Sequence, residues 1–323
     1  MERFSQFRDR GSGISPFIPH RTPVSALLSV GHFFLFVFRL PLFLLYAGFY
    51  FVLLTHLPLP QFVRKLLLWG MLVIPGIWWI DLQLDGVKRG HLHKKSIERI
   101  PYEGTLIAAQ FTSPIDALYL ATIFDPIFTV SYPGTQKVTR ISTLGAILRA
   151  RAPVQLAPPS PKNLTTLRGI VENNPHRVVV VFPECSTTNG RGLLPLSPSL
   201  LSAPADTKIF PVSLRYTPQD ITTPIPGAYF GFFWELLSRP THYVRVRIAE
   251  AVTTKSEAVT GKPAALDSED EDADPGEDPI TPEGRQLLDH IGETLARLAR
   301  NKRVGLTLRD KAAFVEAWGK RRK

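Results

Sequence analysis

The most strongly apolar part of this chain lies near its N-terminus. Residues 24–57 are almost wholly apolar, interrupted by Arg39 and Pro41, and residues 66–80 form a second apolar run. A helix needs about 20 apolar residues to cross the hydrocarbon core of a bilayer, so the first run is long enough and the second is short. The pattern predicts a membrane-embedded helical hairpin over residues 24–81, either a bent hairpin or one span followed by a re-entrant helix.

Cations flank both apolar runs and do not choose between these topologies. They precede, separate and follow the runs, at Arg21, Arg64, Lys65, Lys88 and Arg89. An excess of cations marks the cytosolic flank of a membrane helix, and here every flank carries one. A monotopic hairpin with all flanks in the cytosol therefore stays open beside a spanning one. Residues 1–23 are polar, and we expect them to form a flexible tail.

From residue 82 to about residue 252 the pattern alternates between strands and helices. Short runs rich in β-branched residues predict strands over residues 105–110, 127–131, 178–181, 209–216 and 243–249. Helices are predicted over residues 115–124, 138–149 and 163–173. Strands separated by helices are typical of an α/β fold with a mixed, largely parallel sheet flanked by helices. The arginine-containing strand at 243–249 is expected near an edge of that sheet.

The C-terminal part begins with an acidic stretch. Residues 253–280 are poor in apolar side chains, and residues 267–278 alone carry eight carboxylates, which predicts a disordered loop. Residues 281–323 are predicted to form two helices, over 282–303 and 308–318, before a basic end.

Composition narrows the classes of function. The 323 residues carry a formal net charge of +10 even though the acidic loop offsets part of the basic charge. A basic surface suits nucleic acid, an anionic membrane or an anionic substrate. The apolar N-terminal runs favour the membrane, and we expect no nucleic-acid partner. A single cysteine excludes an intramolecular disulfide and fits a reducing, cytosol-facing domain.

The valine strand and the turn after it are the most informative segment. Four consecutive valines, Val178–Val181, fit a strand buried on both faces, and Pro183 ends it because proline cannot donate to the ladder. Glu184 thereby reaches the C-terminal edge of the sheet, which is where ligands bind in open α/β sheets. The hydroxyls of Ser186 and Thr187 follow directly. Glu184 is therefore a candidate functional carboxylate.

A second motif ends the strand at 105–110 and opens the next helix, Gln110-Phe111-Thr112-Ser113-Pro114-Ile115-Asp116. Together with Phe182-Pro183-Glu184-Cys185-Ser186-Thr187, and after an apolar hairpin, it resembles the motifs of the glycerolipid acyltransferase family. Those motifs read Asn-His-x-x-x-x-Asp and Phe-Pro-Glu-Gly-Thr. The run Thr187-Thr188-Asn189-Gly190-Arg191 is similar to the branch that includes fungal lysophosphatidic acid:acyl-CoA acyltransferases. The resemblance covers residues 82–252.

The resemblance implies transfer of an acyl chain from acyl-CoA to a lysophospholipid, most directly lysophosphatidic acid, in phospholipid and triacylglycerol synthesis. It implies acyl-CoA as co-substrate, no bound cofactor or metal, membrane lipids as partners, and a cytosol-facing domain at the endoplasmic reticulum or lipid droplet. Asp116 and Glu184 take the catalytic positions. The substrate-binding residues are expected to be Thr112, Ser113, Pro183, Ser186, Thr187, Arg191, Lys137 and Arg140. The three cations among them would bind phosphate.

The chain departs from the family's motif at the histidine. Phe111 takes that position and cannot accept a proton, and loss of a general base typically costs about 10²- to 10⁴-fold in rate. His91 or His93 could supply a base, and Cys185, where the family has glycine, allows a covalent acyl-cysteine relay. Three functions stay open: the acyltransferase, a catalytically impaired relative that binds lipid or acts as a scaffold, and a basic peripheral protein that recognises anionic lipid by charge.

Overall fold

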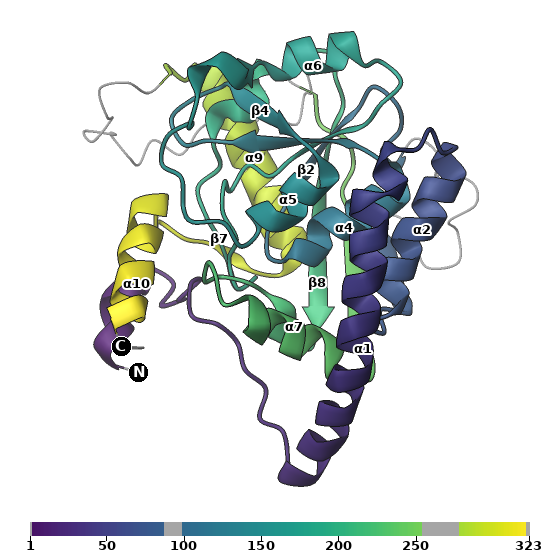
Figure 1. Ribbon diagram of the computed structural model, residues 1–323. Helices are drawn as coiled ribbons and strands as arrows, with labels where there is room; N and C mark the ends of the chain where they lie inside the picture. Colours follow the sequence, from purple (N-terminus) through teal and green to yellow (C-terminus); the bar gives the residue numbers. More distant parts are fainter. Residues whose placement is uncertain (1, 87–98, 254–277, 321–323) are drawn as a thin grey trace.

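Runs of buried β-branched residues build an eight-stranded sheet at the centre of the chain (Figure 1). This computed structural model describes residues 2–86, 99–253 and 278–320. The strand order is β1-β9-β8-β2-β6-β3-β4-β5. The strands are β1 (Trp79–Leu84), β2 (Leu106–Ala109), β3 (Ile127–Ser131), β4 (Val138–Ile141), β5 (Leu164–Thr165), β6 (Val179–Val181), β8 (Ile209–Thr217) and β9 (Tyr243–Ile248).

The sheet is mixed, and its centre is parallel. Parallel pairing joins β8, β2, β6 and β3 in that order and also joins β1 to β9. Antiparallel pairing joins β8 to β9, β3 to β4, and β4 to β5. The predicted fold class, an α/β fold with a largely parallel sheet flanked by helices, is confirmed. A small second sheet pairs β7 (Gly192–Leu193) with β10 (Lys302–Arg303).

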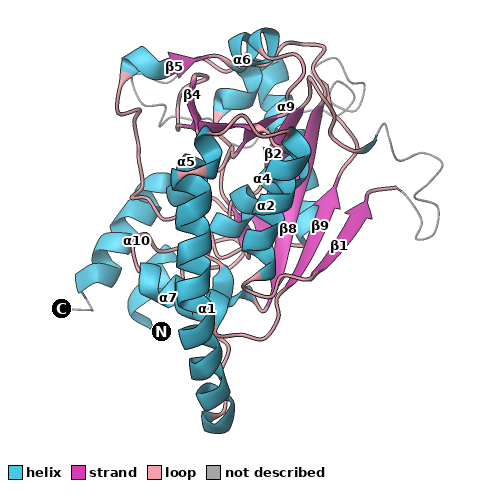
Figure 2. Cartoon of the chain, turned by 45° about the vertical axis from the view of Figure 1, so that its right-hand side comes forward, coloured by secondary structure: helices cyan, strands magenta, loops and turns pink. Residues whose placement is uncertain are grey.

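Helices cover both faces of the large sheet (Figure 2). They are α1 (Ala26–Val52), α2 (Gln61–Val73), α4 (Pro114–Phe124), α5 (Thr143–Arg149), α6 (Leu167–Asn173), α7 (Tyr229–Leu237), α9 (Pro282–Ala299) and α10 (Leu308–Lys320). Ile107 and Val180 face the layer that holds α4, whereas their neighbours Leu106 and Val179 face α9. The valine strand is thus buried on both faces, as its sequence predicts.

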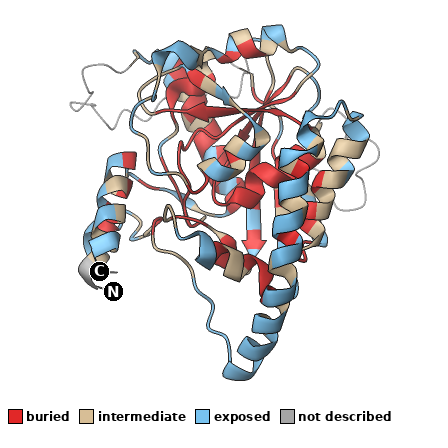
Figure 3. Ribbon diagram, viewed as in Figure 1, coloured by how far each residue is buried: buried red, intermediate tan, exposed pale blue. Residues whose placement is uncertain are grey.

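The N-terminal apolar runs form two helices and an edge strand. Among the described residues, α1 with the turn after it is the helix that is long and apolar enough to cross a membrane. It is exposed along most of its length (Figure 3). The second run is not helical throughout, because α2 ends at Val73 and Trp79 opens β1. Gly76 turns the chain between them at φ +86°, where an added Cβ would lie 2.4 Å from the Pro240 carbonyl oxygen. Membrane insertion of this hairpin stays a prediction.

The expectation of a flexible polar tail before residue 24 is wrong for much of that segment. Phe7 and Phe17 are buried against Phe314 of α10. Their ring centroids lie 5.3 Å and 5.8 Å, respectively, from the Phe314 centroid. They belong to a hydrophobic cluster that also holds Cys185 and Leu194. The aromatic side chains between the arginines explain the difference, because together they bury enough apolar surface to order the segment. The N-terminal segment Glu2–Phe7 thus packs against α10 (Figure 1).

Three predicted helices have different limits. The helix predicted over 282–303 ends at Ala299, and residues 302–303 form β10. The helix predicted over 138–149 is the strand β4 followed by α5, with Ser142 as the N-cap that accepts from the Gly145 amide at 3.1 Å. The helix predicted over 163–173 begins at Leu167, after the short strand β5. The strand expected near an edge, β9, lies second from the edge, next to β1. Most of the acidic loop lies outside the described residues, and the predicted domain limits stay predictions.

Candidate active site

Asp116 lies at the start of α4, where the second motif turns from strand to helix. Ser113 is the N-cap and Asp116 completes a capping box. Its Oδ2 accepts from the amides of Thr112 at 2.6 Å and Ser113 at 2.8 Å, and its Oδ1 accepts from the Tyr216 hydroxyl of β8. Burial raises the pKa of Asp116 to about 6, although these hydrogen bonds oppose the shift. The carboxylate is therefore fixed in place and ionised at neutral pH.

Glu184 joins the two motifs through the backbone. Its Oε1 accepts from the Phe111 amide at 3.1 Å, and its Oε2 accepts from the Leu194 amide at 3.2 Å. The side chain is fully buried, which raises its pKa to about 8. The structure thus brings Glu184 to the end of β2, next to the motif that carries Asp116. The catalytic roles of both carboxylates stay predictions.

Phe111 lies in the hydrophobic core. Its ring stacks on Phe182 with centroids 4.3 Å apart and planes 22° apart, and it is 1% exposed. It borders an apolar pocket that also includes Ala146 and Arg149 of α5. No described histidine lines this pocket or the polar one below, and His91 and His93 lie outside the described residues. Phe111 is therefore a packed aromatic ring, and its correspondence to the histidine of the resembled motif stays a prediction.

Lys311 of α10 holds the turn after Glu184. Its ammonium donates to the Ser186 hydroxyl at 2.7 Å, to the Thr187 hydroxyl at 3.3 Å and to the Thr187 carbonyl oxygen. Burial lowers the pKa of Lys311 to about 7, and the nearby Glu184 opposes the shift. Sequence reasoning missed this residue because it lies outside the segment that carries the resemblance. The available signal was its spacing from Leu308, which places a lysine on the apolar face of a helix.

Cys185 adopts a left-handed conformation, with φ +59°. Glycine is the residue best suited to that backbone, which accounts for the family's glycine at this position. The thiol is buried, and burial raises its pKa to about 12. Because the thiolate is the nucleophilic form, this environment argues against the acyl-cysteine relay.

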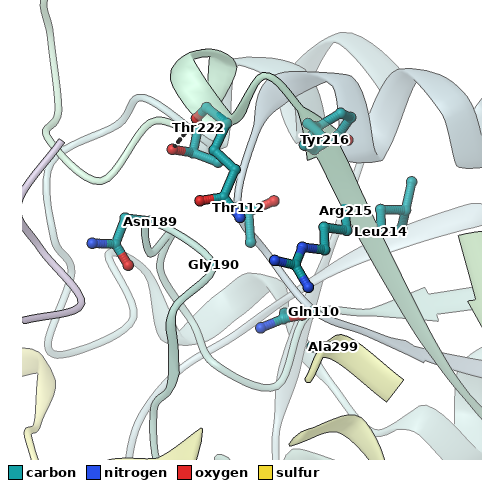
Figure 4. A pocket seen from close by; sticks show the side chains of 10 residues that line it. Gln110, Thr112, Asn189, Gly190, Leu214, Arg215, Tyr216, Thr222 and Ala299 are labelled. Carbon is teal, nitrogen blue, oxygen red and sulfur yellow. Dashed lines mark hydrogen bonds between the residues drawn. The ribbon is translucent and has the colours of Figure 1, made fainter. Parts of the chain in front are cut away.

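The motif Gln110–Asp116 and the run after the Phe-Pro-Glu motif border a polar pocket (Figure 4). It is lined by Gln110, Thr112, Asn189, Gly190, Leu214, Arg215, Tyr216, Gln219, Thr222 and Ala299. Thr112 and Tyr216 are the residues whose side chains donate to Asp116, so the pocket lies directly beside that carboxylate. Its walls come from β2, β8 and the turn after Glu184.

Few of the predicted substrate-binding residues line this pocket. Thr112 lines it. Arg191 follows the pocket residue Gly190, but its side chain points outward, and a guanidinium nitrogen lies 3.1 Å from the His20 Nδ1. Lys137 and Arg140 lie at β4, which is separated from β2 by β6 and β3, so the structure does not bring them to the site.

The remaining predicted residues are occupied within the fold. The Ser113 hydroxyl donates to the Ile221 carbonyl oxygen at 2.8 Å, and Pro183 accepts from the Ser197 amide at 2.8 Å. Ser186 binds Lys311, and the Thr187 hydroxyl donates to the Thr223 carbonyl oxygen at 2.6 Å. The cation at the pocket is Arg215, which sequence reasoning missed.

Comparison with known proteins bears on this site. The chain is 24% identical over 338 residues, 99% of both chains, to a Schizosaccharomyces pombe protein named "Putative lysophosphatidic acid:oleoyl-CoA acyltransferase". It is 26% identical over 205 residues, 61% of each chain, to lysophosphatidic acid:oleoyl-CoA acyltransferase 1 of Saccharomyces cerevisiae. The crystal structure of PlsC, the 1-acyl-sn-glycerophosphate acyltransferase of Thermotoga maritima, aligns with a TM-score of 0.40 and 16% identity, over 85% of this chain and 95% of that one. No family model matches the chain. The two yeast proteins confirm the resemblance to lysophosphatidic acid acyltransferases.

Proposed function

We propose that this chain is a membrane-bound acyltransferase that transfers an acyl chain from acyl-CoA to lysophosphatidic acid at the pocket beside Asp116. The observation that carries the proposal is the contact between the two motifs. Glu184 of one accepts from the Phe111 amide of the other, and Thr112 lines the pocket together with Gly190, which follows the Phe-Pro-Glu motif. The names of the two yeast relatives supply the substrates.

The proposed reaction needs a proton acceptor in place of the missing histidine. The lysophosphatidic acid hydroxyl attacks the thioester carbonyl carbon, the carbon–sulfur bond breaks, and CoA leaves as the thiolate. We assign the hydroxyl proton to Asp116, received through the Thr112 hydroxyl, whose oxygen lies 3.1 Å from Oδ2. A base with a pKa of about 6 is ionised at neutral pH yet still basic enough to accept a proton. Thr112→Val removes this path and should lower kcat about 10²-fold or more.

The buried Phe111 ring favours a second candidate, a lipid-binding relative without catalysis. Its stacking on Phe182 removes any proton acceptor from the motif position. This candidate keeps the pocket and the membrane surface but predicts no turnover.

One experiment separates the two functions. The full chain is purified in detergent micelles, mixed with oleoyl-CoA and lysophosphatidic acid, and the released CoA thiol is followed. The proposal expects saturable turnover that Asp116→Ala removes, while Asp289→Ala, at an exposed carboxylate paired with Arg303, changes nothing. No turnover by the natural chain, with turnover gained by Phe111→His, would establish the lipid-binding relative instead.

Membrane binding is proposed to use the exposed face of α1. Large apolar side chains such as Phe38, 73% exposed, and Leu45, 74% exposed, point away from the protein along this helix. Contiguous apolar patches of this kind mark interaction surfaces. The double change Phe38→Glu with Leu45→Glu should release the chain from liposomes in a flotation assay, whereas Gln61→Glu, at an exposed polar position, should not. A location at the endoplasmic reticulum or lipid droplet, facing the cytosol, is part of the same proposal.

A further inference from the structure

We infer that the polar pocket of Figure 4 binds a phosphate monoester through the Arg215 guanidinium and the Gln110 side-chain amide. The inference rests on the proposed function for the origin of the phosphate but not for the site itself. It assigns the phosphate to Arg215, on β8, rather than to the cations expected from the sequence.

Gln110 presents an unused donor to the pocket. Its side chain is 2% exposed, and its Oε1 accepts from the Ser213 hydroxyl at 3.1 Å, which orients the amide. Its Nε2 has no hydrogen-bond partner within the described part of the chain. Buried donors are nearly always paired, because an unpaired one loses its hydration without compensation. A ligand oxygen in the pocket would supply the missing acceptor.

Arg215 supplies the charge. It lies on β8 between Leu214 and Tyr216, which are buried in the layer of α4, so its own side chain extends from the opposite face of the strand. In Figure 4 the guanidinium extends from β8 toward Gln110. Arg215 is exposed, and no carboxylate within the described residues forms a salt bridge with its guanidinium. A guanidinium binds two oxygens of a phosphate at once.

Two other arginines lie on the same face of the sheet as Arg215. In the β8–β9 pairing, Arg215 lies opposite Arg245 and Ser213 lies opposite Arg247. Arg245 is paired with Asp81, and Arg247 donates to the Leu298 carbonyl oxygen at 2.7 Å, at the negative end of α9. The Asp116 carboxylate beside the pocket accepts hydrogen bonds from Tyr216 and Thr112. Three arginines, Arg215, Arg245 and Arg247, therefore lie on this face of the sheet.

The donor set favours phosphate over a carboxylate. The amide comes from Gln110, the residue after β2, and the guanidinium comes from the adjacent strand β8, and they approach the pocket from different directions. Donors spread in this way match the several oxygens of a tetrahedral dianion. The pocket is open to solvent, so a ligand group can approach both donors from outside the protein.

Two phosphate monoesters occur in the proposed reaction, one on lysophosphatidic acid and one at the 3′ position of CoA. The test therefore measures KM for both substrates with the natural chain, Arg215→Met and Arg215→Lys. Losing a charged hydrogen bond should raise the KM of the phosphate-bearing substrate about 10- to 100-fold with little change in kcat. Arg215→Lys should have a KM between those of the natural chain and Arg215→Met, because lysine keeps the charge but cannot bind two phosphate oxygens with the paired donors of a guanidinium. Arg168→Met, at an exposed arginine of α6, is the matched control.

Substrates without the group identify the source. If the head group binds here, the effect of Arg215→Met should vanish with monooleoylglycerol as acceptor. If CoA binds here, the effect should vanish with oleoyl-dephospho-CoA as donor, which lacks the 3′-phosphate. A variant with the same KM as the natural chain for all four substrates would overturn the inference.

A binding measurement keeps this inference separate from the proposed function. Inorganic phosphate and glycerol 3-phosphate are titrated against the full chain in micelles by calorimetry, with no turnover required. Binding that Arg215→Met and Gln110→Leu both weaken supports the site even if the chain proves inactive. Turnover by the natural chain together with phosphate binding that neither variant changes would leave the proposed function standing and reject the phosphate site.

Discussion

Replacing Lys311 by methionine tests whether a buried cation holds the turn after Glu184. The lysine ammonium donates to Ser186 and Thr187 from inside a cluster that includes Leu308 and Phe314. Methionine keeps the volume and the apolar stem and removes the charge and the donors. One consequence does not depend on pH: the Thr187 carbonyl loses a donor, which costs about 1–3 kcal/mol of stability.

The second consequence depends on pH, and its sign follows from linkage. The folded chain holds the Lys311 proton more weakly than the unfolded chain, because burial lowers the pKa from 10.5 to about 7. Between these values the unfolded state binds more protons, so the stability of the natural chain rises with pH relative to Lys311→Met. At about 1.4 kcal/mol per pH unit the full difference is roughly 5 kcal/mol.

The assay is chemical unfolding of both proteins in detergent micelles, followed by tryptophan fluorescence, at several pH values from about 6 to about 10. The free-energy difference between the natural chain and Lys311→Met should widen steadily above about pH 7. Lys320→Met provides the control on the same helix, because Lys320 is exposed and paired with Glu316. A difference that stays constant across the range would refute the placement of Lys311 as a buried, desolvated cation.

Three further changes test other parts of the site. Glu184→Gln has one acceptor for two amide donors, so it should lose about 1–3 kcal/mol in denaturant melts, and the loss should shrink as pH rises from about 4.5 through about 8, where the natural glutamate ionises. Cys185→Ala should keep near-normal turnover, because burial raises the pKa of the thiol to about 12 and disfavours the nucleophilic thiolate. Complete loss of turnover in a stably folded variant would instead support the acyl-cysteine relay. Tyr216→Phe removes a donor that stabilises ionised Asp116, so the pKa of Asp116 should rise above about 6 and the acid limb of the rate profile should move to higher pH.

Local sequence rules were sufficient where one element buries itself alone. The four valines require no partner to show that their strand is covered on both faces, and Ser113 and Asp116 show where α4 begins. Local sequence rules fail where pairing with a neighbouring strand determines the secondary structure. The segment 138–141 is short and runs directly into α5, so a local pattern joins it to that helix, whereas its antiparallel pairing with β3 makes it a strand.

The same limit applies to the site. The two motifs have a recognisable spacing, and the structure joins them through the hydrogen bond from the Phe111 amide to Glu184. Arg215 and Lys311 belong to neither motif. The role of Arg215 depends on which face of β8 its side chain occupies, and the role of Lys311 depends on how α10 packs against the turn after Glu184. Contacts between distant parts of the chain determine both positions, so a local stretch of sequence does not predict them.

The contact between α10 and the turn after Glu184 also sets an order of events during synthesis. Ser186 and Lys311 are 125 residues apart along the chain. At ribosomal speeds of about 5–20 residues per second, the turn waits on the order of 10 s for the lysine that fixes it. The N-terminal helix α1 is made long before either. A nascent chain can therefore reach a membrane before its reaction centre is assembled, and a fragment limited to residues 82–252 should lack a stable centre altogether.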